Sequence, residues 1–389
     1  MLKAARIEPH LSQALGAPRA LGMPQGSGMP HVSCDVDAFA SIHVGQVSRS
    51  LISNLATHVA VVGAGLNAAP VTINTAEPGN AWVCSPYTAY CSYAIEELQR
   101  LVALPLAWPL VQLCRAAGAA LRSAEIDRAV AINNWLLSTN LYGKFDCTTL
   151  SSWIEEARDR WPGHSIWFRS LNDAWTPQWL VALNEAGFLM IPSRQVYLYS
   201  DIATLPANNL RTDFRLLRTT PLRQCDGASF QQADWARAET LYSQLYLQKY
   251  SRLNPAYRAS FMQAWHRAGL LQVTGFRDEA GLLQAVVGTF EREGVVTAPI
   301  VGYNTGLPQH LGLYRLLMAA VLKYAADSGQ RVNLSAGAAQ FKRLRGGVPA
   351  IEYSAVLVSH LPRHRQRAVR VLRVLTERVG VPLMRRFKL

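Results

Sequence analysis

The sequence predicts an α/β (α+β) protein of two domains, with a mixed, mostly antiparallel sheet flanked by helices. Three observations lead to this expectation. The chain has 389 residues, and one domain commonly takes about 100–200. Hydrophobic residues make up 50% of it and charged residues 17%, which is enough apolar material for a large core. Segments with helical spacing alternate with strand-like segments along most of the chain.

The N-terminal part shows little periodicity. Residues 1–57 are rich in glycine, proline and serine, and we expect an irregular leader there. The next segment, HVAVVGAGLNAAPVTIN, contains Gly-x-Gly-x-x-Ala from Gly63, the outline of a dinucleotide fingerprint. A true fingerprint continues directly into a helix, whereas here Pro70 and a β-branched run follow. The segment therefore predicts a β-hairpin.

Helical and strand-like segments then alternate through the rest of a first domain at 58–215. Ser85 is the expected N-cap of one helix, with Pro86 in its first turn. Residues 203–227 are polar and turn-rich, which predicts a linker. The expected helices are 85–101, 123–140 and 177–188, and the expected strands are 165–171 and 190–201.

The second half shows a more regular pattern. Helices at about 231–250 and 255–268 precede three strand-like segments joined by short turns. The segment LGLYRLLMAAVLKYAADSG has apolar residues at helical spacing and ends at Gly329. A short strand RVNLSAG, a short helix AAQFKRLRGG and a strand AIEYSAVLVS complete the order. We place the second domain at 216–360 and a basic tail at 361–389.

The tail carries most of the net charge. The formal charge of the chain is +13, and from His360 to Leu389 nine Lys and Arg residues face one acid, Glu377. Arginines alternate with valine and leucine there, which is typical of a basic amphipathic helix on an anionic membrane surface. An arginine-coated helix packed on the domain is the other interpretation. The remaining residues are only mildly basic, which argues against a nucleic-acid-binding module.

The sequence indicates neither a metal site nor a membrane span. Its six cysteines form no CxxC pair and its nine histidines form no cluster with zinc-ligand spacing. Isolated cysteines are typical of a reducing compartment. The first residues lack the apolar core of a signal peptide, and the run LVALPLAWPLVQL is shorter than the ~20 residues that span a bilayer. We expect a cytoplasmic protein.

The order of elements in the second half points to a known family. Together with TAPIVGYNTGLPQHLGLYRLL, NLSAGAAQFKRLRGG and EYSAVLVSHLP, it resembles the GNAT acyltransferase superfamily, and more closely its FemABX-related branch. The resemblance covers roughly residues 230–360 and is only architectural for the first half. It implies tandem GNAT-like domains with a degenerate first domain. It also implies acyl-CoA as a co-substrate, with no permanently bound cofactor.

The resemblance places the phosphates of coenzyme A at the start of the long helix. Free N–H groups and the helix dipole favour an anion there. GNAT enzymes carry Q/R-x-x-G-x-G/A at this point, and this chain reads QHLGLY from Gln309 to Tyr314, with tyrosine replacing the second small residue. An ordinary helix cap after a turn is the alternative interpretation. The residues expected to bind the cofactor are Gln309, Gly312, Leu313, Arg343 and Arg345.

Transfer of an acyl group to an amine needs a base for the amine and an acid for the departing thiolate. By the resemblance, Glu291 is the expected base, and Tyr303 and Tyr353 are the expected acids. Lys342 lies where Fem-like relatives carry a lysine near the reaction centre. We expect it to stabilise an oxyanion or to bind an acceptor phosphate. A solvated lysine and ordinary half-buried tyrosines are the alternative interpretations.

These expectations favour an acyl-CoA-dependent N-acyltransferase that acts on a primary amine, including a long-chain or lipid-like amine. An acyl carrier protein is a further candidate donor. One alternative is a Fem-like transferase that uses aminoacyl-tRNA, although no sustained heptad repeat suggests a coiled-coil arm. A second is a non-catalytic, membrane-associated protein that keeps a GNAT fold. The expected partners are the donor, the amine and an anionic membrane surface bound through 361–389. With that surface, the protein would lie on the inner face of a membrane.

Overall fold

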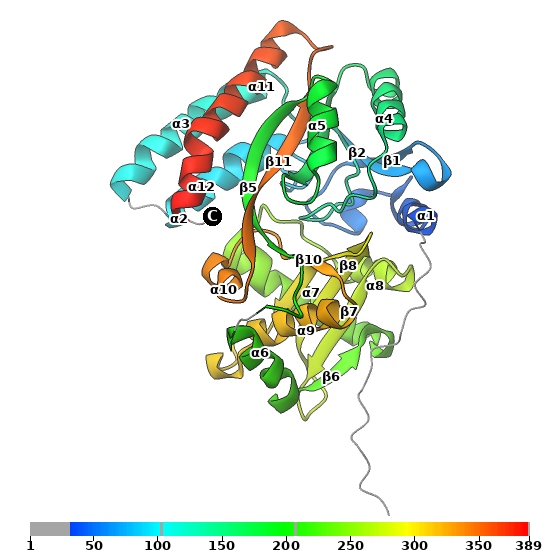
Figure 1. Ribbon diagram of the computed structural model, residues 1–389, viewed down its shortest axis with the longest axis vertical. Coiled ribbons are helices and arrows are strands. Elements are labelled where there is room, and N and C mark those ends of the chain that lie inside the picture. Colours follow the sequence, from blue (N-terminus) through cyan, green and yellow to red (C-terminus); the bar gives the residue numbers. More distant parts are fainter. Residues whose placement is uncertain (1–31, 102–103, 206–207, 388–389) are drawn as a thin grey trace, which may run out of the picture. The chain divides into compact units, whose positions relative to one another are not determined.

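The computed structural model describes residues 32–101, 104–205 and 208–387 (Figure 1). The expected leader therefore lies partly outside the described residues. From residue 32 to 57 it is not irregular, because helix α1 (Val32–His43) forms there and Phe39, Ile52 and Leu55 are fully buried. No helix among the described residues is both long and apolar enough to cross a membrane.

The described strands form one eleven-stranded sheet in the order β1-β2-β3-β4-β11-β5-β10-β9-β8-β7-β6. All neighbouring strands are antiparallel except β3 with β4 and β9 with β10. The strands are β1 (His58–Val62), β2 (Ala69–Thr75), β3 (Arg128–Ile132), β4 (Ser165–Asn172), β5 (Leu189–Tyr199), β6 (Arg223–Asp226), β7 (Gln272–Arg277), β8 (Leu283–Arg292), β9 (Val295–Tyr303), β10 (Arg331–Asn333) and β11 (Val348–Leu357). The expected mixed, mostly antiparallel sheet is confirmed.

Helices flank this sheet (Figure 1). After α1 come α2 (Tyr93–Leu101), α3 (Leu104–Ser123), α4 (Cys147–Arg160), α5 (Pro177–Glu185), α6 (Asn208–Thr219), α7 (Gln232–Tyr242), α8 (Ala259–Arg267), α9 (Leu313–Asp327), α10 (Ala339–Arg343), α11 (Arg363–Leu375) and α12 (Val381–Phe387). Wider π-helical turns precede α2 (η3, Thr88–Ser92), follow α7 (η5, Ser243–Tyr250) and join α11 to α12 (η7, Thr376–Gly380).

The two halves of the sheet repeat one arrangement. Strands β1, β2 and β3 are antiparallel and β4 is parallel to β3, while β7, β8 and β9 are antiparallel and β10 is parallel to β9. In both halves a long helix joins the parallel pair, and a short helix leads to the last strand. The last strands are exchanged, because β11 pairs with β4 and β5 pairs with β10. Figure 1 shows β5 and β11 side by side between the halves.

Because of this exchange, the expected boundary at residue 215 does not separate two complete sheets. Strand β5 belongs to the first half by sequence and completes the sheet of the second, and β11 does the reverse. The expected linker at 203–227 instead contains α6 and β6. The expected helix at 123–140 is also wrong, since this segment holds β3, in the sheet interior between β2 and β4. The hairpin expected around Gly63 is confirmed as β1 and β2.

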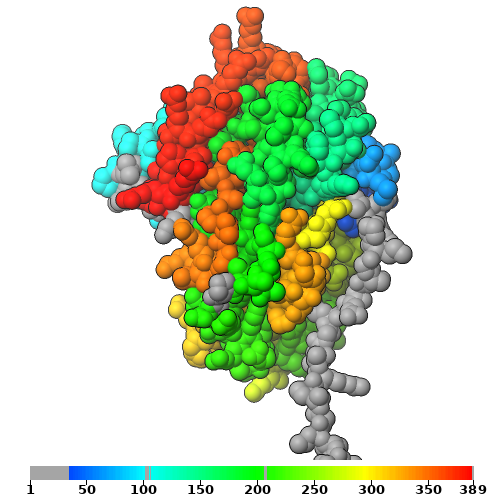
Figure 2. All heavy atoms as spheres, in the orientation of Figure 1, coloured from blue at the N-terminus to red at the C-terminus, as the bar shows by residue number. Residues whose placement is uncertain are grey.

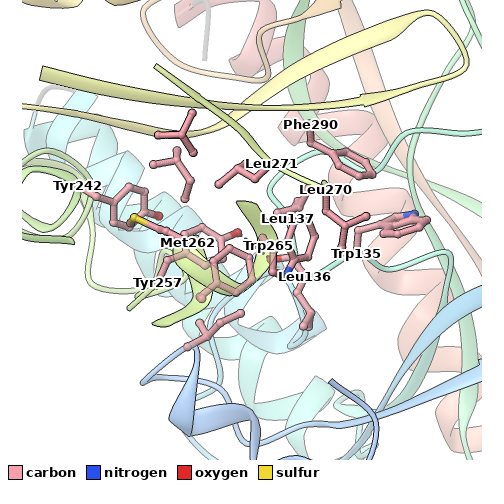
Figure 3. Packing of buried hydrophobic residues seen from close by; sticks show 14 of the residues in the cluster. Trp135, Leu136, Leu137, Tyr242, Tyr257, Met262, Trp265, Leu270, Leu271 and Phe290 are labelled. Atoms are coloured by element: carbon pink, nitrogen blue, oxygen red, sulfur yellow. Dashed lines mark hydrogen bonds between the residues drawn. The ribbon is translucent and has the colours of Figure 1, made fainter. Parts of the chain in front are cut away.

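A large aromatic core joins the halves (Figure 3). Trp135, from the loop after β3, lies with its ring centroid 5.2 Å from that of Phe290 on β8. Trp265 of α8 packs against Phe290 from the other side of this cluster, at 5.9 Å. The Tyr257 hydroxyl donates a hydrogen bond of 2.7 Å to the Leu136 carbonyl oxygen. Burying side chains of this size stabilises the fold by about 1.5–3 kcal/mol each. Because these side chains come from both halves, the two halves share one core.

Candidate functional site

A cavity of about 540 Å³ lies where the two halves meet. Side chains from both halves and from the C-terminal helices line it. One part is charged and aromatic, and it includes Trp82, Tyr93, Glu97, Arg169, Arg194, Tyr246, Lys342 and Glu352. Another part is apolar, and it includes Leu98, Leu110, Leu113, Leu372, Leu375, Val379, Leu383, Met384 and Phe387. Its size is in the range of ordinary small-molecule sites, about 300–1,000 Å³.

The parallel strands β9 and β10 separate from each other beside the cavity. The pairs between β9 and β10 end at Thr297 and Asn333. Beyond that point β9 continues beside β8, whereas residues 334–335 exchange backbone hydrogen bonds with Tyr197 of β5. Ala298, Val301 and residues 334–339 line the cavity. The edge of β9 that faces β10 is thus left beside the cavity, where an extended ligand can pair with backbone groups.

Gly302 allows the helical layer to approach β9 closely. A Cβ atom at this position would lie 2.5 Å from the Tyr242 backbone nitrogen and 2.7 Å from the Leu241 carbonyl carbon. Any side chain here would therefore push the end of α7 away from the strand. Tyr246, one turn further along, lines the cavity.

Lys342 lies in the cavity wall and is buried, with 3% of its surface exposed. Its Nζ donates to the carbonyl oxygens of Leu334, Ser335 and Ala336, at 2.7, 3.2 and 2.8 Å. Burial lowers the pKa of Lys342 to about 7, and the Arg194 charge acts in the same direction. Three carbonyl acceptors engage all the protons of an ammonium group. Lys342 therefore holds the loop after β10 in place and brings a positive charge to the cavity wall.

A second group of charges surrounds Trp82. Arg194 binds Glu352 through Nε and Nη2, at 2.8 and 3.1 Å, and only 2% of Glu352 is exposed. The guanidinium carbons of Arg194 and Arg169 lie 4.8 and 5.0 Å from the Trp82 ring centroid. An aromatic face stabilises such cations. With Lys342, these side chains give the cavity wall more positive than negative charge.

Glu97 also lines the cavity, and it is not among the residues expected from the sequence. Its side chain lines the cavity from α2, as does that of Tyr93 on the same helix. Burial raises the pKa of Glu97 to about 7, although the guanidinium groups of Arg100 and Arg194 act in the opposite direction. A carboxyl group that titrates near neutral pH is suited to act as a general base. In the sequence Glu97 follows Glu96 in an amphipathic segment, a pattern that indicates a solvated helix face.

Glu291, the expected base, does not line the cavity. It ends β8 and accepts hydrogen bonds from the Tyr324 hydroxyl, at 3.0 Å, and from the Gln330 amide. Tyr324 lies near the C-terminal end of α9, ten residues from Tyr314, which lines the cavity. At 1.5 Å per residue this separation is about 15 Å. The structure therefore does not bring Glu291 together with Lys342.

The two expected acids also lie outside the cavity lining. Tyr303 ends β9, and its ring centroid is 6.4 Å from that of Tyr314. Tyr353 packs on the opposite face of β11, among the side chains of the core formed with α4 and α5. Its neighbours Glu352 and Ser354 face the cavity instead. Successive side chains of a strand point to opposite faces, which explains this result.

The start of α9 keeps the features expected for an anion site in part. Gly312 has a φ of 60° and no side chain caps the helix, so the first N–H groups of α9 have no such acceptor. Gln309 is exposed, whereas the side chain of Leu313 is buried in the core. Tyr314 turns its ring toward Phe341 of α10, 4.9 Å away, and lines the cavity. Tyrosine thus fills the space between α9 and α10 and does not crowd the helix start.

The two expected phosphate-binding arginines differ in environment. Arg345 is buried and forms an ion pair with Asp213 of α6, which also binds Arg315 at 2.8 Å. Its charge is thereby engaged in joining α6 to α10. Arg343 is exposed on the surface of α10. Of the two, only Arg343 presents its guanidinium to solvent.

The equivalent helix of the first half starts differently. Asp146 caps α4, and its carboxylate accepts a 2.6 Å hydrogen bond from the Thr149 N–H group. A carboxylate from the chain itself thus occupies the favourable position for an anion. The start of α4 therefore lacks the uncapped N–H groups that the start of α9 has.

Three thiols line the cavity, at Cys84, Cys91 and Cys114. Burial raises the pKa of Cys84 and of Cys91 to about 12, and it raises that of Cys114 as well. These groups are therefore protonated at neutral pH and are poor nucleophiles. Within the described part of the chain, no three His, Cys, Asp or Glu side chains are placed to hold a metal ion.

The C-terminal tail is helical and partly packed. Val369 and Leu372 of α11 are buried, and buried Arg365 forms an ion pair with Glu125 and donates to the Gly163 carbonyl oxygen at 2.8 Å. One side of the amphipathic helix therefore covers the domain, and the residues after it line the cavity.

No protein-family model matches the chain, and no curated protein matches it. Similar solved structures include L-PGS from Bacillus licheniformis, with 12% identity, a TM-score of 0.44, and coverage of 58% of this chain and 77% of that one. The C-terminal domain of a protein from Agrobacterium fabrum named as a lysylphosphatidylglycerol synthetase has 13% identity and a TM-score of 0.47, over 89% of this chain and 97% of that one. FemX has 9% identity and a TM-score of 0.42, over 55% and 77%.

At identities and TM-scores this low, the similarity to these structures gives no information about the substrate or the donor of this chain. The fold itself is identified by the repeated order of three antiparallel strands, a long helix, a parallel strand, a short helix and a last, exchanged strand. The chain thus has two GNAT-like halves in tandem, as the sequence predicted.

Proposed function

We propose that this protein transfers an acyl group from a thioester to the primary amine of an amphiphilic acceptor. The donor is acyl-CoA or an acyl carrier protein. One observation carries the proposal: a single cavity joins a charged region, at the parting of β9 and β10, to an apolar region between α2, α3 and the C-terminal helices.

The second half offers a place for the donor. The amide groups of a pantetheine arm suit pairing with the free edge of β9 beyond Thr297. The uncapped start of α9 and the exposed Arg343 suit phosphate groups. Gln309 and Gly312 are the further residues that we assign to the donor.

The cavity wall offers groups for the chemistry. The amine nitrogen attacks the thioester carbonyl carbon, the carbon–sulfur bond breaks, and an amide and a thiol result. Glu97 accepts the proton that the amine loses, and this proton leaves with the thiol product. The positive charges of Lys342 and Arg169 stabilise the oxygen that becomes negative in the transition state. Lys342 also positions the loop at 334–336.

The apolar region supports a long-chain substrate. It is lined by leucines, a valine, a methionine and a phenylalanine of five helical segments. A buried CH₂ group contributes about 0.8 kcal/mol, so a chain of several carbons gains much of its affinity here. We expect activity to increase with the chain length of one of the two substrates.

Release of free CoA from a series of acyl-CoAs, in the presence of alkyl amines and amino acids, tests the proposal. We expect release that requires an amine and falls at least a hundredfold in Glu97→Gln. Glu96→Gln, at the adjacent position outside the cavity lining, is the matched control and should keep its activity. The Lys342→Met variant should lose activity. Lys323→Met is its control and should keep its activity, because Lys323 is exposed on α9 and pairs there with Asp327.

Two results would redirect the proposal. Amine-dependent activity with aminoacyl-tRNA and none with any acyl thioester would favour the Fem-like alternative. Equal activity in Glu97→Gln and Glu96→Gln, with both variants folded by circular dichroism, would remove Glu97 from the mechanism.

A further inference from the structure

The outer side of the C-terminal helices, beside α3, carries exposed apolar side chains among arginines. Val371 is 54% exposed and Val374 is 43% exposed, and both lie on α11. We call this surface the α3–α11 face, and Figure 2 shows its C-terminal helices, in red, at the surface beside α3, in cyan. Its exposed residues are Arg363, Arg367, Arg370, Val371, Val374, Arg378, Arg385 and Arg386 of the C-terminal helices.

The charge of this face is strongly positive. Among the described residues, the ion pairs of this region use Arg365, which is buried, and Arg373, which binds Glu377 at 3.0 Å. The arginines on the α3–α11 face are in none of the ion pairs of the described residues. A basic residue close to an anionic bilayer contributes about 1 kcal/mol to binding.

An apolar groove connects this face to the cavity. Ala117, Ala120 and Leu121 of α3 line it on one side, and Val371 and Leu375 of α11 line it on the other. Ala117, Leu372 and Leu375 line both the groove and the large cavity. These three side chains therefore lie between the groove and the apolar region of the cavity.

We propose that the α3–α11 face docks on an anionic lipid bilayer and that the groove admits an alkyl chain from the bilayer to the cavity. Arginine charge alone would equally suit RNA. The exposed valines between the arginines favour a bilayer, because such side chains enter the headgroup region and gain nothing from a phosphate backbone. Docking does not depend on the proposed chemistry, whereas the role of the groove rests on it.

Co-sedimentation of the full chain with vesicles tests docking. We expect binding to equimolar phosphatidylcholine and phosphatidylglycerol, at least tenfold weaker binding to phosphatidylcholine alone, and weakening by salt. Reversing two charges in Arg367→Glu/Arg370→Glu should reduce binding to the anionic vesicles at least tenfold. The control Arg215→Glu/Arg218→Glu makes the same charge change on the exposed side of α6 and should bind like the natural protein.

A second variant separates apolar insertion from charge. Val371→Ser/Val374→Ser keeps every arginine, and we expect it to bind at low salt but to dissociate at lower salt than the natural protein. Equal loss in the α6 and α11 charge variants would overturn docking through this face. So would competition by RNA that displaces the protein from vesicles while the valine variant behaves normally. Vesicle binding without acyl transfer would leave docking intact and refute the proposed chemistry alone.

Discussion

At the scale of single residues, the charged groups of the cavity wall decide what the cavity can do. Glu97, Glu352 and Lys342 lie in the same wall, but each has a different environment. Glu352 is bound by Arg194 and Lys342 by three carbonyl oxygens, so both are engaged. Glu97 has no ion pair among the described residues, and burial places its pKa near 7. It is therefore the carboxyl group that can exchange a proton at neutral pH.

The pKa of Glu97 predicts the pH dependence of activity. A base must be deprotonated to act, so kcat/KM should increase as pH rises toward about 7, and it should fall above that value because Lys342, whose pKa is also about 7, then loses its positive charge. The measurement is kcat/KM between pH 5 and 9, a range of about four units around that value. In Glu97→Gln the remaining activity should no longer rise through this range. A rise that persists unchanged would assign it to another group.

The same residue predicts a pH dependence of stability. Its pKa is about 7 in the folded protein and 4.5 in the absence of burial. Between these values the folded protein holds a proton that the unfolded chain has lost, so the free energy of unfolding decreases as pH rises from 4.5 to about 7. Denaturant unfolding of the natural protein and of Glu97→Gln should diverge across this window. Parallel curves would contradict the burial of Glu97.

The Asp213 ion pair predicts a stability effect unrelated to activity. Asp213→Asn leaves Arg345, whose side chain is 8% exposed, without its counter-ion, and should reduce the free energy of unfolding by about 3–5 kcal/mol. Asp327→Asn, in an exposed pair with Lys323, should cost less than about 1 kcal/mol. Urea titrations of both variants check this, and equal effects would show that the buried pair has no special role.

At the scale of elements, the parting of β9 and β10 and the approach of α7 to β9 shape the site. Short β10 leaves β9 after three residue pairs because its chain turns to β5. The helical segments that cover β9 contribute Leu245, Tyr246 and Tyr250 to the cavity. Their position depends on the absence of a side chain at Gly302.

Gly302→Ala tests this contact. The new Cβ would meet backbone atoms at 2.5 and 2.7 Å, so α7 must shift, and we expect a loss of about 1–3 kcal/mol together with weaker donor binding. Gly306→Ala is the control, since the nearest neighbour of the new Cβ would be the half-buried Asn304 side chain at 3.3 Å. A difference in stability within error between the two variants would show that α7 has room at β9.

At the scale of the whole molecule, the exchanged strands make the two halves dependent on each other. Removing the second half would leave β4 without β11, and removing the first would leave β10 without β5. The aromatic core around Trp135 and Trp265 also draws side chains from both halves. Residue 215 therefore separates two repeats of one arrangement, but neither repeat is an independent folding unit.

This predicts one cooperative unfolding transition. Far-UV circular dichroism and tryptophan fluorescence should give coincident urea curves for the full chain, because unfolding one half exposes the core and strands of the other. A polypeptide of residues 216–389 alone should show no sharp transition. Two resolved transitions, or a well-folded isolated half, would contradict this dependence.

Most of the second half could be predicted from the sequence, because its helices and strands are long, periodic and joined by short turns. The π-helical turn before α2, the strand at 128–132 and helix α6 were missed. Residues 128–132 read Arg-Ala-Val-Ala-Ile, a composition that suits a helix, but both neighbouring strands and the packing on both faces make it a sheet interior. Tertiary context overrides such weak local preferences.

The sequence by itself determined the fold class, the order of elements in the second half, the start of α9 and the basic amphipathic tail, because each follows from local spacing and composition. Only the tertiary structure decided which charges meet. Strand alternation turned Tyr353 away and Glu352 inward, and the length of α9 separated Glu291 from the cavity. Glu97 reached the cavity from a helix some 245 residues before Lys342, a distance along the chain that no local pattern encodes.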